Sequence, residues 1–209
     1  MKQIQLQVAF FLSRFIERPD TLFYNKLSNE YNPPVILPPQ NPLPGLLFID
    51  SPVVQAVSKN GLINLTISNM RLDITIKNLF VNVENDIIRR YYGILKDYSI
   101  IRVGFVSQFV ERSEDSSQIF KKYLKIDDGV SEVSFRYNRK TCQNGININD
   151  VMNIQDAEFE ENGNKQRGVL FVRDINSDPA SKKEMDVEKI LGLYHYSSNQ
   201  FNEMCNGEN

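Results

Sequence analysis

The chain has 209 residues, of which 41% are hydrophobic and 11% aromatic, so it can bury a core as one domain or as two associated halves, about 1–99 and 100–209. Its 24 basic and 26 acidic residues give a net charge of −2. That balance excludes a general electrostatic attraction to nucleic acid or to an anionic membrane, although a local basic patch is still allowed.

The start of the chain and its cysteines predict a cytoplasmic protein. Residues 1–8 alternate between polar and apolar side chains, where a signal peptide would need a continuous apolar run. The longest apolar runs, Val8 to Leu12 and Leu46 to Ile49, are too short to span a bilayer. Cys142 and Cys205 fit no metal or redox spacing, so we expect free thiols in a reducing compartment.

The first half of the chain predicts strands around a proline-rich connector. Residues 3–12 alternate as a strand, and Pro19-Asp20-Thr21 is typical of a helix start. Six prolines in residues 33–45 predict an extended connector, either a strap across the body, which we favour, or a ligand for a proline-recognition domain. Further strands are predicted at 46–50, 53–58, 62–68 and 71–77.

Helical spacing of apolar residues predicts a long helix over about 80–97. The second half then repeats the theme, with a strand at 100–112, a short helix at 115–125 and a strand over 133–138. Asn144-Gly145 is predicted to lead into a strand at 146–155, and Asn162-Gly163 to turn residues 151–159 into a strand at 167–175, before a final helix at about 186–204.

Three Asn-Gly pairs, Asn60-Gly61, Asn144-Gly145 and Asn162-Gly163, lie between alternating stretches. Such a pair supplies the left-handed residues of a tight turn, so each predicts a β-hairpin. We therefore predict an α+β fold on a mainly antiparallel sheet, with three or four helices covering one face and two packed sheet halves as a variant. Val169 to Val172 is apolar on both faces, which predicts a central strand.

Metal-dependent hydrolysis rests on a few carboxylates near the end of a predicted strand. Asp174 and Asp178 are spaced like the first ligands of a calcium loop, but the glycine and glutamate that complete such a loop are absent. A divalent-ion site built with Glu158 or Glu160 is the best enzymatic hypothesis. The only histidine, His195, is a further catalytic candidate for such a hydrolase. It lies in the last helix without ligand-spaced partners, so we favour a packed or half-exposed helix residue.

Nucleic-acid binding rests on basic residues near aromatic ones. Arg136, Arg139 and Lys140 surround Tyr137, as an RNA-binding sheet would require. Alternation, however, places Tyr137 opposite Arg136, which favours a core residue beside a solvated face. No Glu-x-Lys on a predicted strand, no phosphate-binding loop and no dinucleotide-binding glycine motif is present.

Two segments carry a family resemblance: Ile101-Arg102-Val103-Gly104-Phe105 with Gln108-Phe109-Val110, and residues 170–176 followed by Leu191-Gly192-Leu193-Tyr194-His195 and Phe201. Together they resemble a sporadically distributed bacterial protein family of unknown function, over less than half of the chain. The resemblance implies a cytoplasmic bacterial protein of patchy occurrence, as for accessory, defence-island or phage-related genes. It implies no catalytic residue.

The sequence thus favours a non-catalytic accessory subunit that binds another protein and needs no cofactor. The reason is that no nucleophile, base and oxyanion donor can be assembled from the residue types present. A metal-dependent hydrolase and an RNA-binding module are the alternatives. Membrane association is not expected, nucleic acid is not favoured, and a homo-oligomer stays open.

Overall fold

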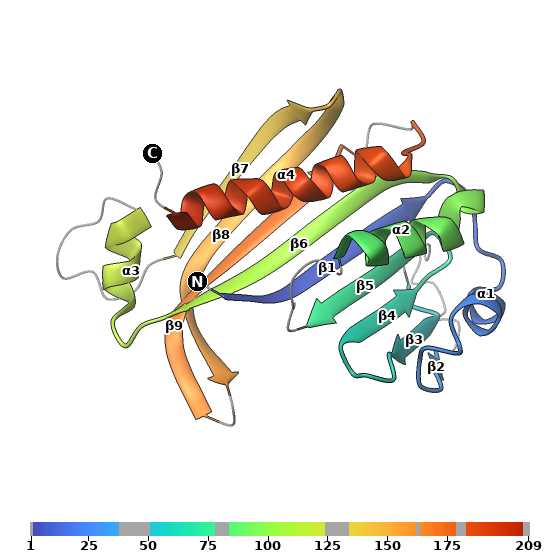
Figure 1. Cartoon of the computed structure of the whole chain (residues 1–209), viewed down its shortest axis with the longest axis horizontal. Helices are drawn as coiled ribbons and strands as arrows, with labels where there is room; N and C mark the ends of the chain where they lie inside the picture. Colours follow the sequence, from blue (N-terminus) through green and yellow to red (C-terminus); the bar gives the residue numbers. More distant parts are fainter. Residues whose placement is uncertain are drawn as a thin grey trace, which may run out of the picture.

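The computed structural model describes residues 2–37, 51–77, 84–123, 134–161, 164–178 and 183–206. These residues form one sheet of nine strands in the order β2-β3-β4-β5-β1-β6-β9-β8-β7, with four α-helices (Figure 1). All neighbouring strands are antiparallel. The predicted α+β class is confirmed, and a single continuous sheet replaces the variant with two packed halves.

Most strands lie close to their predicted positions, but β2 was not predicted and β7 extends five residues beyond its predicted end. Their bounds are β1 Lys2–Leu12, β2 Val35–Ile36, β3 Val54–Val57, β4 Ile63–Ile67, β5 Arg71–Lys77, β6 Ile100–Arg112, β7 Ser134–Gln143, β8 Ile146–Glu161 and β9 Asn164–Ser177. The two-residue β2 falls in the proline-rich connector. The rest of that connector beyond residue 37, and the strand predicted at 46–50, lie outside the described residues.

The four helices are α1 Pro19–Lys26, α2 Glu84–Leu95, α3 Ser116–Tyr123 and α4 Val187–Asn206, and a short 3₁₀ turn, Lys96–Tyr98, follows α2. All four were predicted, α1 from the helix-start signal at Pro19-Asp20-Thr21 and α2 from the helical spacing of its apolar residues. The first residues of the helix predicted at 80–97 lie outside the described part of the chain. None of the described helices is both long enough and apolar enough to cross a bilayer.

Two of the three Asn-Gly pairs lie in hairpin connections of the described residues. Asn60-Gly61 lies in the connection between the paired strands β3 and β4, where only Gly61 of the two has a positive φ, 74°. At the turn between β7 and β8, Asn144 and Gly145 have φ values of 50° and 75°, the left-handed conformations of a type I′ turn. Residues 162 and 163 themselves are not described, but the register on either side pairs Glu161 with Asn164.

Each strand presents one set of residues to the helices. Leu6, Val8 and Phe10 of β1 are fully buried in the main core, together with residues of α1, α2 and α4. The neighbouring register pairs Val8 with Phe105 of β6, and Phe105 with Ile175 of β9, which belong to the same core. We call this side the covered face; Figure 1 shows α2 and α4 lying across it.

A second, smaller core lies under α3. Its buried residues are Ile119, Phe120, Met152, Ile154, Val169 and Phe171. The strand residues in it occupy the same register positions as the covered face, since Ile154 faces Phe171 across β8 and β9. All four helices therefore pack on one side of the sheet, and no described helix packs on the other, which we call the open face.

Candidate functional site

The open face is mainly polar, because period-two alternation turns the remaining residue of each strand away from the helices. The register places these residues in rows across the strands. One row runs through Asp73, Ala9, Gly104, Asn176 and Asn149 to Lys140. Amide, carboxylate and ammonium groups from sequence positions 73 to 176 thus share one surface.

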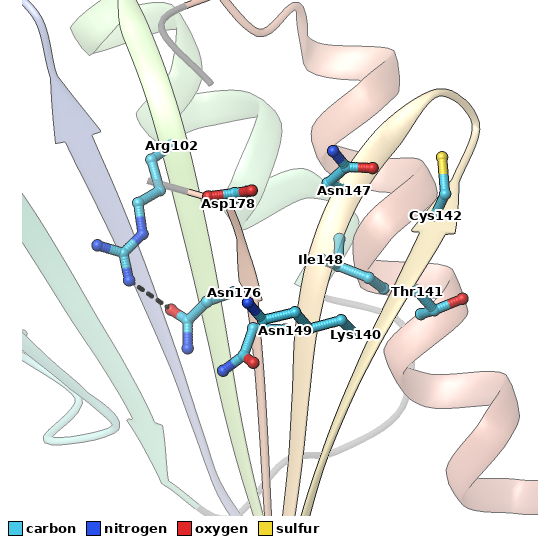
Figure 2. Close-up of a pocket in the computed structure, with 9 residues that line it drawn as sticks. All are labelled: Arg102, Lys140, Thr141, Cys142, Asn147, Ile148, Asn149, Asn176 and Asp178. Atoms are coloured by element: carbon cyan, nitrogen blue, oxygen red, sulfur yellow. Dashed lines mark hydrogen bonds between the residues drawn. The ribbon is translucent and has the colours of Figure 1, made fainter. Parts of the chain in front are cut away.

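A pocket lies where this surface meets the β7–β8 hairpin. Its volume is about 700 Å³, within the range of small-molecule sites. Figure 2 shows the side chains that line it, which come from β6, β7, β8 and β9 and the residue after β9. They are Arg102, Lys140, Thr141, Cys142, Asn147, Ile148, Asn149, Asn176 and Asp178.

Arg102 is held firmly at one side of the pocket. Its guanidinium carbon lies 4.4 Å from the centre of the Phe11 ring, and Arg71 contacts the same ring at 4.7 Å. Arg71 also forms an ion pair of 2.7 Å with Asp73. Arg102 has no carboxylate within ion-pair distance among the described residues, and its buried Nε has no hydrogen-bond partner. Its one hydrogen bond is donated by Nη2 to the Asn176 side-chain oxygen, at 3.5 Å.

Gly104 allows Asn176 to reach this position. A Cβ at residue 104 would lie well inside van der Waals contact of the Asn176 side-chain oxygen, so only glycine leaves room for that amide to lie over β6. The amide nitrogen of Asn176 donates to Asp174 on the same strand. Sequence reasoning singled out Asp174, whereas Gly104, which pairs with Asn176, is the residue that makes room for a polar side chain at this point of the open face.

Asp174 is partly buried in the open face, one row beyond the pocket. Burial raises the pKa of its carboxyl group above the ordinary value of 3.8, while the hydrogen bond from Asn176 and the charges of Arg102 and Arg136 lower it. The direction of the net shift shows that burial outweighs the partners. At neutral pH the ionised carboxylate of Asp174 lies in a site that favours its protonated form, so its charge destabilises the fold.

A second pocket, of about 820 Å³, lies beside the start of α3 and is acidic. Glu114, Asp115, Asp156 and Glu158 all line it. Asp115 caps α3 by accepting from the backbone N–H of Ser117 at 3.0 Å, and its contacts with Ser117 hold the pKa of its carboxyl group below its usual value. These contacts account for Asp115 as a structural residue.

The carboxylates proposed for a metal site do not converge. Asp174 and Asp178 are on the same strand and its extension, four residues apart, so their backbones are about 13 Å apart. Glu158 faces Arg167, which is seven residues from Asp174 along β9, so the backbones of Glu158 and Asp174 are about 23 Å apart along the strand direction. It forms an exposed ion pair of 3.3 Å with Arg167. Glu160 has no described side chain, and the described residues contain no group of three or more His, Cys, Asp or Glu side chains that could hold a metal ion.

His195 lies on the helix side of the molecule, far in structure from the open face. It is exposed on α4, and its Nε2 hydrogen-bonds to the side-chain oxygen of Asn85 at the start of α2, at 3.1 Å. The ring is 5.8 Å from that of Tyr194. These contacts tie α4 to α2 and resemble those of a packed helix residue.

The basic residues proposed for RNA binding divide between the two faces. Arg136 and Lys140 lie on the open face, whereas Arg139 shares the covered-face positions with Phe135 and Tyr137. There its Nη2 donates to Asp150 at 3.0 Å and to the Tyr196 hydroxyl at 3.3 Å. The aromatic rings of β7 thus point away from Arg136 and Lys140, as the alternation predicted.

Sequence reasoning missed a buried charge cluster beneath α4. Arg173, 2% exposed, donates twice to the fully buried Asp150, at 3.0 and 2.8 Å, and Arg139 adds a third hydrogen bond to that carboxylate. Arg173 also donates to the backbone oxygen of Ser197 in α4 at 3.4 Å. The signal was available: both charged residues occupy core-facing positions of strands that are otherwise apolar there.

Compared with models of known protein families and with curated protein sequences, the chain matches none. The resemblance carried by residues 101–110 and 170–201 stays a prediction.

Proposed function

We propose that this chain is a non-catalytic interaction protein, and that β7 binds an extended, acidic segment of a partner protein by adding it to the sheet. Antiparallel sheets accept peptides in this way when an outer strand is free: backbone hydrogen bonds hold the peptide and the neighbouring side chains select it. One observation carries the proposal: a ten-residue strand at the edge of the sheet is exposed along almost its whole length.

The two edges of the sheet differ sharply. At one edge, β2 has two residues, a length typical of a blunted edge. At the other, β7 has ten residues and pairs, within the described part of the chain, with β8 alone. Every residue of β7 except Thr141 and Gln143 is exposed. A long, accessible row of backbone groups is what strand addition requires.

The hairpin turn fixes which backbone groups face outward. Gln143 and Ile146 flank the two-residue turn, and in such hairpins the flanking pair is hydrogen-bonded. Because the pattern alternates, the N–H and C=O groups of Arg136, Asn138 and Lys140 point away from β8. The side chains of these three residues lie on the open face, so a docked strand would contact both their outward backbone groups and their side chains.

Charge favours an acidic partner over a second copy of this chain. The segment from Ser134 to Gln143 contains Arg136, Arg139 and Lys140 and no acidic residue. Arg139 is compensated by Asp150, whereas Arg136 and Lys140 form no ion pair with the described residues. Two β7 strands side by side would therefore repel each other, which natural proteins exploit to keep edges apart.

A pair of substitutions at Asn138 tests the proposal. Asn138→Pro removes an outward N–H and leaves the bonds to β8 in place, since proline is tolerated on the outer side of an edge strand. Asn138→Ala removes only the side chain and is the matched control. We expect a partner captured from the native host by the whole chain to be lost at least tenfold with Asn138→Pro and retained with Asn138→Ala.

Hydrogen exchange on the purified complex locates the contact. The outward amides of Arg136 and Lys140 should be protected when the partner binds, and Arg136→Glu should weaken the complex because it replaces attraction by repulsion. Equal capture by the wild type and Asn138→Pro, or protection confined to α2 and α4, would refute the proposal. Circular dichroism of both Asn138 variants checks that the sheet is intact.

The sequence resemblance adds context to this proposal. An accessory protein of the bacterial cytoplasm would act by binding a partner, so it would need an interaction surface and would not need a catalytic centre. The hydrolase and RNA-binding alternatives have less support, because their carboxylates are about 13 Å or more apart and their cations are not backed by aromatic rings.

A further inference from the structure

We propose that the pocket beside the β7–β8 hairpin binds a hydroxylated small molecule that carries a phosphate or carboxylate group, such as a sugar phosphate or a sugar acid. This site does not depend on strand addition at the edge. Its principal group is Arg102, and its occupant would be a small molecule of the size class that 700 Å³ accommodates.

The first argument is net positive charge. Arg102 and Lys140 line the pocket together with one carboxylate, Asp178, and neither cation forms an ion pair with a described residue. Arg102 is only partly exposed, so its charge is poorly screened by water. An anion at Nη1, or at the N–H of Nη2 that does not donate to Asn176, would form charge-assisted hydrogen bonds, which are the strong kind.

The second argument is preorganisation. The Phe11 ring supports the guanidinium of Arg102 on one side, and Asn176, seated over Gly104, holds one of its nitrogens. A fixed planar guanidinium loses little further freedom when it binds an oxyanion. The buried Nε without a partner is a cost of holding the side chain in this orientation.

The third argument concerns the ligand's other groups. Between Arg102 and Lys140 the pocket is lined by the amides of Asn147, Asn149 and Asn176 (Figure 2). A side-chain amide both donates and accepts, which suits hydroxyl groups. Asp178, whose backbone N–H donates to the backbone oxygen of Asn147 at 2.8 Å, also lines this part of the pocket.

The spacing of the two cations sets the ligand's length. Arg102 and Lys140 lie on β6 and β7, three strand spacings apart, and the register offsets them by two residues along the strands, so their backbones are separated by about 16 Å. Both side chains are long and can approach each other, but an inorganic ion held by Arg102 would leave most of the pocket empty. A chain of several hydroxylated carbons ending in an oxyanion spans it better.

Calorimetry with the whole chain tests the proposal with defined probes: ribose 5-phosphate, gluconate, inorganic phosphate and glucose. We expect saturable binding of ribose 5-phosphate or gluconate, at least tenfold weaker binding of inorganic phosphate, and none of glucose. Equal affinity for inorganic phosphate would mean an adventitious ion only. That result, or the absence of binding by both organic anions, would overturn the proposal.

Two asparagines on β8 provide matched variants. Asn149→Asp places a carboxylate inside the pocket with almost no change in shape, whereas Asn153→Asp places one two rows away on the same face. We expect Asn149→Asp to weaken binding of the organic anion at least tenfold and Asn153→Asp to change it less than threefold. Arg102→Gln should abolish binding. Equal effects of the two aspartates would also overturn the proposal.

A thiol at the rim gives an independent readout. Cys142 is exposed, forms no disulfide and lines the pocket, and a Cys205→Ser background leaves it as the only cysteine. Saturating ribose 5-phosphate or gluconate should slow modification of Cys142 by a thiol reagent at least threefold, and glucose should not. An unchanged rate in the presence of an anion that calorimetry shows to bind would place that anion elsewhere and refute this site.

Discussion

Removing the carboxylate of Asp150 should destabilise the fold far more than removing an exposed partner on the same strands. Asp150 is fully buried and receives hydrogen bonds from Arg173 and Arg139. In Asp150→Ala, Arg173 would remain 2% exposed and would lose the carboxylate that accepts two of its hydrogen bonds. Breaking such a pair costs about 3–5 kcal/mol, which for a chain of this size lowers the melting temperature by roughly 6–20 °C.

Glu158 supplies the matched control. It pairs with Arg167 across the same two strands, at 3.3 Å, but the two side chains are 60% and 75% exposed. Glu158→Ala should therefore cost about 0–1 kcal/mol. Urea unfolding followed by circular dichroism gives both free energies, provided the transitions are two-state.

A double variant separates buried charge from lost packing. Asp150→Leu with Arg173→Met replaces both charges by apolar groups of similar size, so no unpaired charge remains in the core. We expect it to recover most of the stability lost in Asp150→Ala. Our reasoning would be refuted if the double variant were as unstable as Asp150→Ala, or if Asp150→Ala cost no more than Glu158→Ala.

Three further predictions concern other positions. Gly168→Ala should lower the free energy of unfolding in urea by about 1–3 kcal/mol, because its Cβ would lie against a backbone carbonyl of β6. Gly93→Ala, in open space on α2, should raise it by about 0.5–1 kcal/mol. The opposite order of stabilities would contradict this prediction. Asp174→Asn should gain stability relative to the wild type as the pH rises from about 3.5 to 7. The pKa of Asp174 is raised in the folded state, so the stability that its protonated carboxyl group contributes is present below the ordinary pKa of 3.8 and is lost as the pH rises through the raised pKa. A stability difference that does not depend on pH would exclude that shift. Tyr31→Phe should cost about 1–3 kcal/mol, because it leaves the buried hydroxyl of Tyr91 without its partner; burial raises the pKa of both phenols, so a new tyrosine titration in the variant below pH 10 would count against a dry site.

Elements that depend on local patterns could be predicted from the sequence. The alternation in Leu72-Asp73-Ile74-Thr75-Ile76 gave β5, and the left-handed turn at Asn144-Gly145 gave the hairpin of β7 and β8. The split of Arg139 from Arg136 was also readable, because alternation puts Arg139 on the same face as Tyr137. Grouping the basic residues by sequence proximity hid that consequence.

Features that depend on long-range pairing could not be predicted. Nothing local shows that Phe11 lies between Arg71 and Arg102, which are 60 and 91 positions further along the chain. The pocket depends on such registers, since each of its four strands contributes only one to three of the lining residues. Gly104 could have raised the question of a close approach, but only the pairing of β6 with β9 identifies Asn176 as the group that needs the space.

The place of β1 in the sheet has a consequence for folding. This first strand pairs with Arg71–Lys77 on one side and with residues 100–110 on the other, so it cannot complete its backbone hydrogen bonds until more than half of the chain has been synthesised. Contacts between residues so far apart in the sequence slow folding, and until they form, the apolar side chains of β1 stay exposed in the nascent polypeptide. We expect pulse-labelled amides of Leu6, Val8 and Phe10 to gain protection together with those of β6, whereas the β3–β4 hairpin can form earlier by itself.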